Sequence, residues 1–226
     1  MPTFMAQLVE RAPLSPHVVG MTFVAAEPFP RAAGQYVVLT LDEGSTHAFS
    51  LASPFEPEAP GRFEIAVTRG TTAESLLELP IGESVSVSGP SGTLVWKADA
   101  PALLVATGTG ISPLRALLKE QLARPAQQPL VLLFGCRDAA EELWGAELRR
   151  LSQLYPRFRF VPTHSQPTPG GRERMGRVQA YLPELVRALG SGLYAYLCGH
   201  TPMVNACMTL LLELGVPAEH VHGESY

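Results

Sequence analysis

A glycine-rich turn near the middle of the chain joins an apolar run to a segment with a helical pattern. The run Ala102–Val105 leads into Thr107-Gly108-Thr109-Gly110, and the helical pattern begins near Ser112. Where a strand leads into a helix in a parallel sheet, the helix N-terminus offers unpaired N–H groups and partial positive charge to a phosphate. Gly108 and Gly110 omit the Cβ atoms that would keep a pyrophosphate from the backbone. The turn therefore predicts a nucleotide-binding α/β sheet.

The turn alone does not specify its ligand. It lacks the Gly-Lys-Ser/Thr of a Walker A loop, and Pro113 stands where the dinucleotide fingerprint Gly-x-Gly-x-x-Gly has its last glycine. Pro113 suits the first turn of a helix, where its missing N–H costs nothing. A plain tight turn between a strand and a helix is the alternative at this point.

From about residue 98, apolar strands alternate with segments of helical length. Continuous apolar strands joined by crossover helices indicate a parallel sheet that is covered on both faces. The expected strands are Leu103–Ala106, Leu130–Phe134, Phe158–Val161 and Leu193–Leu197, and the expected helices begin at Ser112 and cover Glu141–Leu154, Val178–Leu189 and Met203–Leu214.

The earlier residues have the rhythm of short antiparallel strands. Arg62–Thr68 and Ser84–Ser88 alternate polar and apolar side chains, and Gln35–Leu41 is rich in β-branched and aromatic residues. Glycine and proline clusters separate these runs, which is typical of a small antiparallel barrel or sandwich. One short helix is expected at Glu74–Leu79, and the boundary between the two parts is expected within Lys97–Pro101.

Net charge, the length of the apolar runs and the number of cysteines argue against several classes of function. The 226 residues carry a net charge of −4 with no basic run, so nucleic acid is not an expected partner. No apolar run has the length of a membrane span, and the first residues lack a signal-peptide pattern, so we expect a soluble cytoplasmic protein with no membrane partner. The three cysteines are a poor disulfide framework and too few for an iron–sulfur cluster, and no metal site is expected.

Several short motifs together resemble those of the ferredoxin–NADP reductase superfamily. Thr107–Arg115 resembles its pyridine-nucleotide loop, and His47–Ser53 resembles its flavin-binding Arg-x-Tyr/Phe-Ser-x-x-Ser. The other motifs, in the family's order, are Gly34-Gln35-Tyr36, Gly89–Gly92, Cys198–Met203 and Gly223–Tyr226. The resemblance implies two domains: an N-terminal antiparallel flavin-binding β-barrel at residues 1–97, and a C-terminal NAD(P)H-binding α/β domain at residues 98–226 with a five-stranded parallel sheet.

The resemblance assigns Ser50 as a catalytic residue near flavin N5 and places Phe49 along the flavin. Gly70–Ser75 resembles the family's second phosphate loop, at a helix start. The flavin-binding residues assigned in this way are His47, Ala48, Phe49, Ser50, Thr68, Thr72, Ala73, Glu74, Ser75 and Tyr226. Without the motifs, Ser50 would be a strand-edge serine, Phe49 a core residue and Gly70–Ser75 an ordinary capped helix start.

His47 stands where the family has an arginine that pairs with the flavin phosphates. An arginine offers a permanent charge and a bidentate fork, whereas a histidine offers neither reliably at neutral pH. We therefore expect weaker phosphate binding than in the family. This departure favours a flavin used as a substrate, and a bound prosthetic FAD stays open as the alternative.

The resemblance also assigns the nucleotide side of the site. Cys198 flanks the nicotinamide, Glu224 stabilises the transfer or passes protons, and Tyr226 stacks on the flavin until the nicotinamide displaces it; Ser50, Cys198 and Glu224 are the expected catalytic residues. The assigned nucleotide-binding residues are Thr107, Gly108, Thr109, Gly110, Pro113, Arg137, Asp138, Cys198, Gly199 and Met203. The plainer alternatives are a small buried hydrophobe for Cys198, a solvated carboxylate for Glu224 and a frayed residue for Tyr226.

The coenzyme is open between NADH and NADPH, with a slight preference for NADH. Ser165-Gln166 lacks the arginine that follows this serine in NADPH-preferring relatives, Asp138 suits a ribose hydroxyl, and Arg137 suits a phosphate. The expected function is an NAD(P)H-dependent reductase that passes a hydride to FAD, or to FMN, and electrons to a separate ferredoxin, flavodoxin or oxygenase component. A free-flavin reductase and an electron-transfer subunit of a larger complex are the alternatives.

Overall fold

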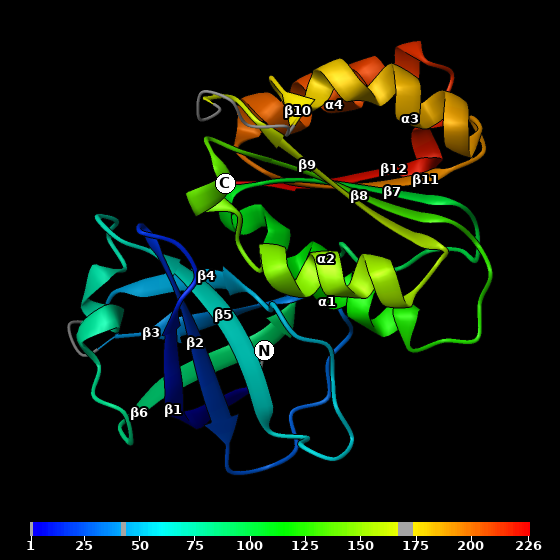
Figure 1. The fold of residues 1–226 in the computed structure, drawn as a ribbon. Coiled ribbons are helices and arrows are strands. Elements are labelled where there is room, and N and C mark those ends of the chain that lie inside the picture. The colour runs from blue at the N-terminus through cyan, green and yellow to red at the C-terminus, as the bar shows by residue number, and fades with distance from the viewer. Residues whose placement is uncertain (1, 42–43, 167–173) are drawn as a thin grey trace.

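The computed structural model describes residues 2–41, 44–166 and 174–226, which form two halves, each built on one sheet (Figure 1). The N-terminal half is antiparallel, with strand order β4-β3-β6-β1-β2-β5. Its strands are β1 (Thr3–Pro13), β2 (Val18–Ala25), β3 (Tyr36–Thr40), β4 (Thr46–Ser50), β5 (Arg62–Thr68) and β6 (Ser84–Ser91). In β6 the valines are buried and the serines between them are not, which is the alternation expected of a sheet with one face on a core.

The barrel closes where its two end strands, β4 and β5, meet. Ala52, just after β4, donates its backbone N–H to the Glu64 carbonyl of β5 at 2.8 Å, and the Glu64 N–H donates to Ser53 Oγ at 3.1 Å. Phe23 and Phe63 stack in the core at 5.5 Å between ring centroids. The expected short helix is a 3-10 helix, η1 (Glu74–Glu78), between β5 and β6.

The C-terminal sheet is parallel, with order β10-β9-β8-β7-β11-β12. Its strands are β7 (Ala102–Thr107), β8 (Leu130–Cys136), β9 (Phe158–His164), β10 (Arg174–Met175), β11 (Tyr194–Gly199) and β12 (Val221–Ser225). The described residues therefore give six strands where five were expected. β10 contributes only two residues, paired with Thr163 and His164, and so short a strand leaves no periodic pattern in the sequence.

Helices cover both faces of this sheet. α1 (Ile111–Leu122) and α2 (Gly145–Leu154) lie on the face toward the barrel, and α3 (Leu182–Leu189) and α4 (Thr201–Glu213) lie on the other (Figure 1). Neighbouring β7 residues divide between the two cores: Leu104 packs on the α1 side, and Leu103 and Val105 pack on the α3–α4 side. This explains why β7 is a continuous apolar run rather than an alternating one.

Two expected helices are shorter than predicted because 3-10 turns precede them. The segment expected as Glu141–Leu154 starts with η3 (Ala139–Glu141), and Trp144, with φ 52°, separates η3 from α2. The segment expected as Val178–Leu189 starts with η4 (Val178–Tyr181) before α3. A left-handed residue such as Trp144 interrupts a helix without changing the apolar periodicity on which the prediction was based.

The strand order reverses at β7, so the turn after β7 lies at the switch point of the sheet. β7 pairs with β8 on one side and with β11 on the other, and the carboxyl ends of the parallel strands β7 and β11 lie side by side. Ligands of such sheets bind outside the carboxyl ends of the strands at this point. The start of α1, through η2 (Gly108–Gly110), therefore stands next to the Cys198–Gly199 end of β11.

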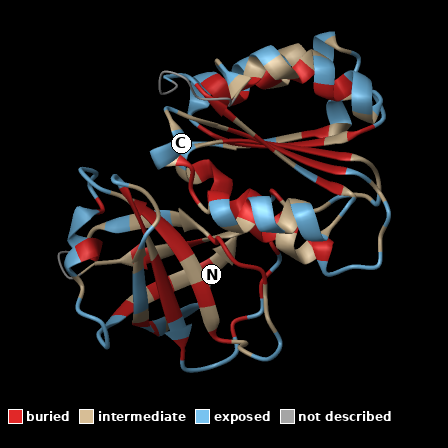
Figure 2. Ribbon diagram, viewed as in Figure 1, coloured by how far each residue is buried: buried red, intermediate tan, exposed pale blue. Residues whose placement is uncertain are grey.

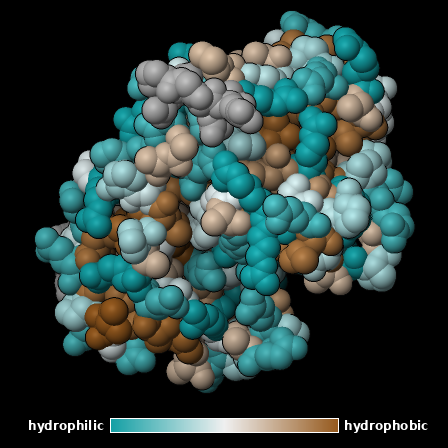
Figure 3. All heavy atoms as spheres, viewed as in Figure 1, coloured by the Kyte–Doolittle hydropathy of each residue, from teal (hydrophilic) through white to brown (hydrophobic). Residues whose placement is uncertain are grey.

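α1 is buried all round because it lies between the parallel sheet and the barrel (Figure 2). Ten of its 12 residues are buried, which is unusual for a helix on one face of a sheet. One apolar core joins the two halves, since Val18, Ala33 and Leu94 of the N-terminal half belong to the same cluster as Leu114 and Leu117 of α1. Apolar side chains also show on the outside of the barrel (Figure 3).

Across the described residues, the structure contains no helix that is long and apolar enough to cross a membrane. The same residues hold no cluster of three or more histidine, cysteine or acidic side chains that could ligate a metal ion. Cys136, Cys198 and Cys207 are all free thiols.

Candidate functional site

Two cavities lie on either side of the turn at the start of α1. The barrel cavity, of about 620 Å³, is lined by Tyr36, His47, Ala48, Phe49, Ser50, Ala66, Thr68, Thr71, Thr72, Ala73, Thr109, Ser112, Cys198, Glu224, Ser225 and Tyr226. The sheet cavity, of about 610 Å³, is lined by Val18, Thr107, Gly108, Gly135, Cys136, Arg137, Glu141, Leu143, Ser165, Gly176, Arg177, Val178, Gln179, His200, Pro202, Met203 and Ala206. Each cavity is large enough to hold part of a dinucleotide.

The barrel cavity opens where the barrel closes. β4 supplies His47 to Ser50, β5 supplies Ala66 and Thr68, and the loop before η1 supplies Thr72. The opposite wall comes from the C-terminal half, through Thr109, Cys198 and Tyr226.

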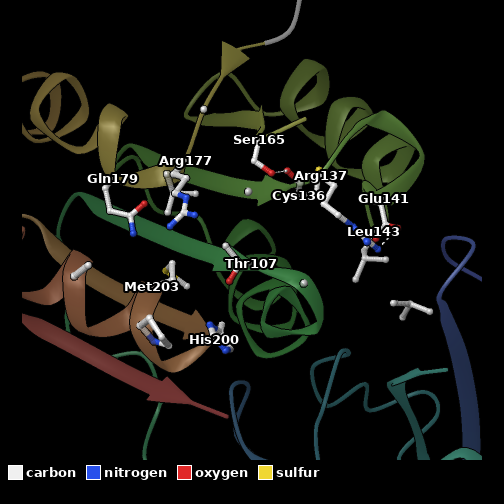
Figure 4. A pocket seen from close by; sticks show the side chains of 17 residues that line it. Thr107, Cys136, Arg137, Glu141, Leu143, Ser165, Arg177, Gln179, His200 and Met203 are labelled. Atoms are coloured by element: carbon white, nitrogen blue, oxygen red, sulfur yellow. Dashed lines mark hydrogen bonds and ion pairs between the residues drawn. The ribbon is translucent and has the colours of Figure 1, made fainter. Parts of the chain in front are cut away.

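The sheet cavity lies over the carboxyl ends of the parallel strands. Arg137 and Glu141 line one side, Arg177 and Gln179 line the other, and Thr107 lies between them (Figure 4). Arg137 is held by Glu141 at 2.8 Å in an i,i+4 ion pair. Arg177 is exposed and has no ion-pair partner among the described residues, so its guanidinium is the free cation of this cavity.

The turn between the cavities depends on two glycines. Gly108 has φ +54°, in the left-handed region that favours glycine. A Cβ on Gly110 would clash with the carbonyl oxygen of Cys198, so only glycine lets the turn approach the end of β11 this closely. Thr107 and Gly108 line the sheet cavity while Thr109 lines the barrel cavity, so this one turn forms part of both walls.

Tyr226 places its hydroxyl in this turn. The phenol oxygen accepts hydrogen bonds from the Gly110 N–H at 3.0 Å and from Thr109 Oγ1 at 3.1 Å, and it donates to the Thr107 carbonyl at 3.1 Å. The ring is largely exposed, but burial of the hydroxyl raises the pKa of Tyr226 above its usual value. The phenol therefore stays protonated and able to donate at neutral pH.

Cys198 and Glu224 are paired in register on β11 and β12 at the barrel cavity. Burial, with the nearby Glu224 carboxyl as a smaller contribution, raises the pKa of the Cys198 thiol to about 12. Burial also raises the pKa of Glu224 above its usual value. Cys198 is therefore a neutral thiol at physiological pH and has no thiolate to act as a nucleophile.

Most of the residues assigned from the sequence line one cavity or the other, but six do not. Gly110, Pro113 and Gly199 shape the turn behind the walls; Gly199 has φ +149°, and a Cβ there would clash with Thr107. Asp138 is occupied as the cap of η3, where its carboxylate accepts from the Ala140 N–H at 2.9 Å. Glu74 lines neither cavity, and Ser75 lines a separate hollow under η1.

Several lining residues were not assigned from the sequence. Tyr36 was quoted only as part of a motif, and Arg177 follows a segment in which no strand was expected. Ser112 is 2% exposed and belongs to the nucleotide motif, but its sequence position does not reveal that its hydroxyl is unpaired. Tyr36 and Ser112 could have been found from their motifs, whereas Arg177 needed the position of β10.

The walls fit a ligand that carries both ring heteroatoms and phosphate. Among the residues that line the two cavities, four buried polar atoms have no hydrogen-bond partner within the described ranges: His47 Nε2, Ser112 Oγ, Thr107 Oγ1 and Gln179 Oε1. Buried polar groups are normally paired, so such atoms indicate groups that a ligand would satisfy. The Gly108–Gly110 turn at a helix start and the Arg177 cation suit an anion. These features suit a flavin in the barrel cavity and a pyridine nucleotide in the sheet cavity.

Comparison with known proteins decides the family. The Oxidoreductase NAD-binding domain family matches residues 104–209. The chain is 38% identical to "Ferredoxin--NADP reductase B" of Sorangium cellulosum, over 99% of this chain and 97% of that protein. The chain belongs to the ferredoxin–NADP reductase family. Membership confirms the family expected from the motifs and makes the chain an NAD(P)H-dependent flavin oxidoreductase with FAD and NAD(P)H as its cofactors.

Two further matched proteins are longer than this chain. The reductase component DmpP of phenol 2-monooxygenase from a Pseudomonas strain is 31% identical over 88% of this chain, which spans 59% of that protein. The structure of the Amycolatopsis cytochrome P450 reductase GcoB superposes with a TM-score of 0.89 at 26% identity, covering 99% of this chain and 69% of that one. The two-domain fold expected from the sequence is confirmed.

Proposed function

We propose that the protein accepts a hydride from NAD(P)H in the sheet cavity and passes electrons to a separate acceptor protein, through FAD held in the barrel cavity. The observation that best supports this proposal is that one turn, Thr107–Gly110, contributes to both cavities: Thr107 and Gly108 line the sheet cavity, and Thr109 lines the barrel cavity. Thr107 and Gly108 would hold the nucleotide on the sheet side, and Thr109 would line the way from there into the barrel cavity. The acceptor we propose is a ferredoxin or an oxygenase component, since related chains are named as reductases of such partners.

The chain's own residues position the reactants in this proposal. FAD, when bound, supplies the hydride acceptor at N5 and the ability to release electrons singly. Ser50 lines the barrel cavity from the end of β4. Cys198 would pack as a neutral thiol against the nicotinamide. Glu224, whose pKa is raised by burial, would lie beside it. Tyr226 withdraws its hydroxyl from the turn when the nucleotide enters.

A second candidate function rests on His47. Its side chain lines the barrel cavity with a buried Nε2 that has no described partner, at the position where the family motif has arginine. A neutral imidazole binds a phosphate less tightly than a guanidinium does. This favours a reductase that takes up and releases FMN or FAD as a substrate.

We also propose that the flavin-binding domain covers residues 1–97 and the nucleotide-binding domain residues 98–226. The end of β6 at Ser91 and the start of β7 at Ala102 support a boundary between them. We propose a cytoplasmic location, which the three free thiols and the need for NAD(P)H support.

The experiment compares two glycine variants of the whole chain. Gly110→Ala closes the turn against Cys198, whereas Gly192→Ala adds a methyl group where no atom lies within 4 Å. We expect Gly110→Ala to lose oxidation of NADH and NADPH while still binding flavin, and Gly192→Ala to match the unaltered protein. Reduction of an added ferredoxin by a protein that stays yellow through gel filtration supports the first candidate. A colourless protein that reduces only added flavin supports the second, and no nucleotide oxidation with any flavin would reject both.

A further inference from the structure

The two halves meet through an apolar core that contains one buried cation. Val18 and Leu94 from the N-terminal half pack against Leu114 and Leu117 of α1. On the face drawn in Figure 3, polar side chains predominate between the two halves. Apolar contacts are not directional, and they hold the halves together without fixing how one is turned on the other.

Arg115, on the second turn of α1, is the cation in this junction. It is 5% exposed, and it lies five residues after Gly110 in the turn that lines both cavities. Toward its own half it forms a fork with Glu147 of α2, with Nε and Nη2 at 2.7 and 3.1 Å from the two carboxylate oxygens. Its guanidinium carbon also lies 4.7 Å from the ring centroid of Trp144.

The other side of the guanidinium reaches into the barrel. Arg115 Nη1 donates to the Ala52 carbonyl at 2.7 Å and to Glu64 Oε2 at 2.8 Å. Ala52 follows Ser50 by only two residues, and Ala52 and Glu64 are themselves joined by a backbone hydrogen bond where the barrel closes. Arg115 therefore bonds directly to the segment that carries Ser50 into the barrel cavity.

The chemistry of this contact explains why an arginine is needed. A planar guanidinium donates in several fixed directions at once, so it can hold two carboxylates and a carbonyl in one arrangement. A lysine in its place would be a point charge without the fork. Buried charged pairs of this kind fix the register between two surfaces more than they add affinity.

We infer that Arg115 is a positioning residue that fixes the Ser50 segment relative to the Gly108–Gly110 turn, and so sets the distance between flavin and nicotinamide. The inference rests on the proposed function, because it concerns the geometry of that transfer. Hydride transfer depends steeply on the approach of the two rings, and a misplacement of about 1 Å can cost roughly 100-fold in rate. Arg115 itself lines neither cavity, so its removal should leave each ligand's own contacts in place.

The test compares two carboxamide variants that remove one carboxylate each from the same arginine. Glu64→Gln weakens the bonds that cross between the halves, and Glu147→Gln weakens the fork within the C-terminal half; the two side chains are similarly exposed, at 28% and 31%. We expect Glu64→Gln to lower kcat several-fold with flavin and nucleotide dissociation constants within about threefold of the unaltered protein. Glu147→Gln should change kcat less. Equal losses from both would overturn the inference.

Arg115→Met gives the larger effect. We expect kcat to fall roughly 10- to 100-fold. We also expect a weaker long-wavelength absorbance band, which forms when the oxidised nucleotide stacks on the reduced flavin. Arg124→Met is the control, because Arg124 pairs with Glu120 in its own half and is exposed. Arg115→Lys should recover only part of the loss.

The outcomes separate the inference from the function on which it rests. If the unaltered protein oxidises no NAD(P)H, the proposed function fails. If it is active, and Arg115→Met retains both its kcat and the long-wavelength absorbance, the positioning role fails. A fall in thermal stability with matching losses of both ligand affinities would also reject that role, because it would show general unfolding. If Arg115→Met does not fold, the Glu64→Gln and Glu147→Gln comparison decides.

Discussion

The phenol oxygen of Tyr226 lies 3.0 Å from the backbone nitrogen of Gly110. The side chain that follows β12 therefore accepts a hydrogen bond from the N–H group just before α1. Free N–H groups at this place are what a phosphate or a polar ligand group needs. We therefore expect Tyr226 and an incoming nucleotide to compete for the same turn.

Removing only the hydroxyl should ease nucleotide binding. In Tyr226→Phe, the Gly110 N–H and the Thr107 carbonyl lose their partner and become available to a ligand. One hydrogen bond is worth about 1 kcal/mol net, so we expect nucleotide affinity to rise about fivefold. Titration of the protein with NAD+ and NADP+ measures it. A weaker affinity for both would show that the hydroxyl assists binding instead.

Removal of the Ser50 hydroxyl should slow flavin reduction. We expect Ser50→Ala to reduce the rate roughly tenfold or more, because it removes a hydrogen bond that acts in the transition state. Anaerobic stopped-flow measurement of flavin bleaching gives the rate. Ser88→Ala is the control, since Ser88 bonds to Thr3 on the barrel's other strands at 3.0 Å. An unchanged rate in Ser50→Ala removes this residue from the mechanism.

The sequence predicted the residues whose role depends on local chain geometry. Gly108 and Gly110 could be assigned because a strand, a tight turn and a helix follow one another within a few residues. The order of barrel and parallel sheet followed from two different periodicities. Both features depend only on residues that are neighbours in the sequence, so they could be predicted without the tertiary structure.

Residues brought together from distant segments could not be predicted in the same way. Arg115 belongs to the nucleotide motif, yet its partners Ala52 and Glu64 come from the other half of the chain. Asp138 was assigned to a ribose contact, and the structure shows that one of its carboxylate oxygens also accepts from the Ala140 N–H at the start of η3. Short polar residues satisfy nearby backbone groups when they can, and the sequence does not show which partner is nearer.

The next prediction concerns His47 in the flavin motif and the affinity of the protein for FAD. We expect His47→Arg to tighten FAD binding several-fold, because a permanent charge with a bidentate fork replaces an imidazole. Quenching of flavin fluorescence measures the dissociation constant. His17→Arg is a suitable control, since His17 contacts Glu141 at 3.6 Å and does not line the barrel cavity. A looser complex would mean that His47 does not face the phosphates.

The position of Arg177 in the sheet cavity leads to a prediction about the preference for NADPH or NADH. Arg137 is already paired with Glu141, so Arg177 is the described cation left to meet a 2′-phosphate near Ser165. We expect Arg177→Ala to lower kcat/KM for NADPH about tenfold and to leave NADH nearly unchanged. Arg187→Ala on α3, outside both cavities, is the control. Equal losses with the two coenzymes would place Arg177 away from the 2′ position.

The raised pKa of Glu224 predicts a stability difference that depends on pH. Burial raises this pKa in the folded protein, so the folded state keeps the proton to a higher pH than the unfolded chain does. Below the unfolded pKa both states are protonated, and Glu224→Gln should then melt at the temperature of the unaltered protein. As the pH rises through the folded pKa, the unaltered protein must carry a buried charge and loses stability, whereas glutamine does not.

The expected result is a Tm for Glu224→Gln that matches the unaltered protein near pH 3.5 and exceeds it by a few degrees at pH 8. Thermal unfolding of both proteins across this range measures the difference, and effects of other titrating groups cancel in the comparison. Glu219→Gln, on η5 before the same strand, is the control for losing a carboxylate at a more exposed position. A variant that melts below the unaltered protein at pH 8 would show that the ionised Glu224 is stabilised, most directly by a hydrogen-bond donor in the barrel cavity.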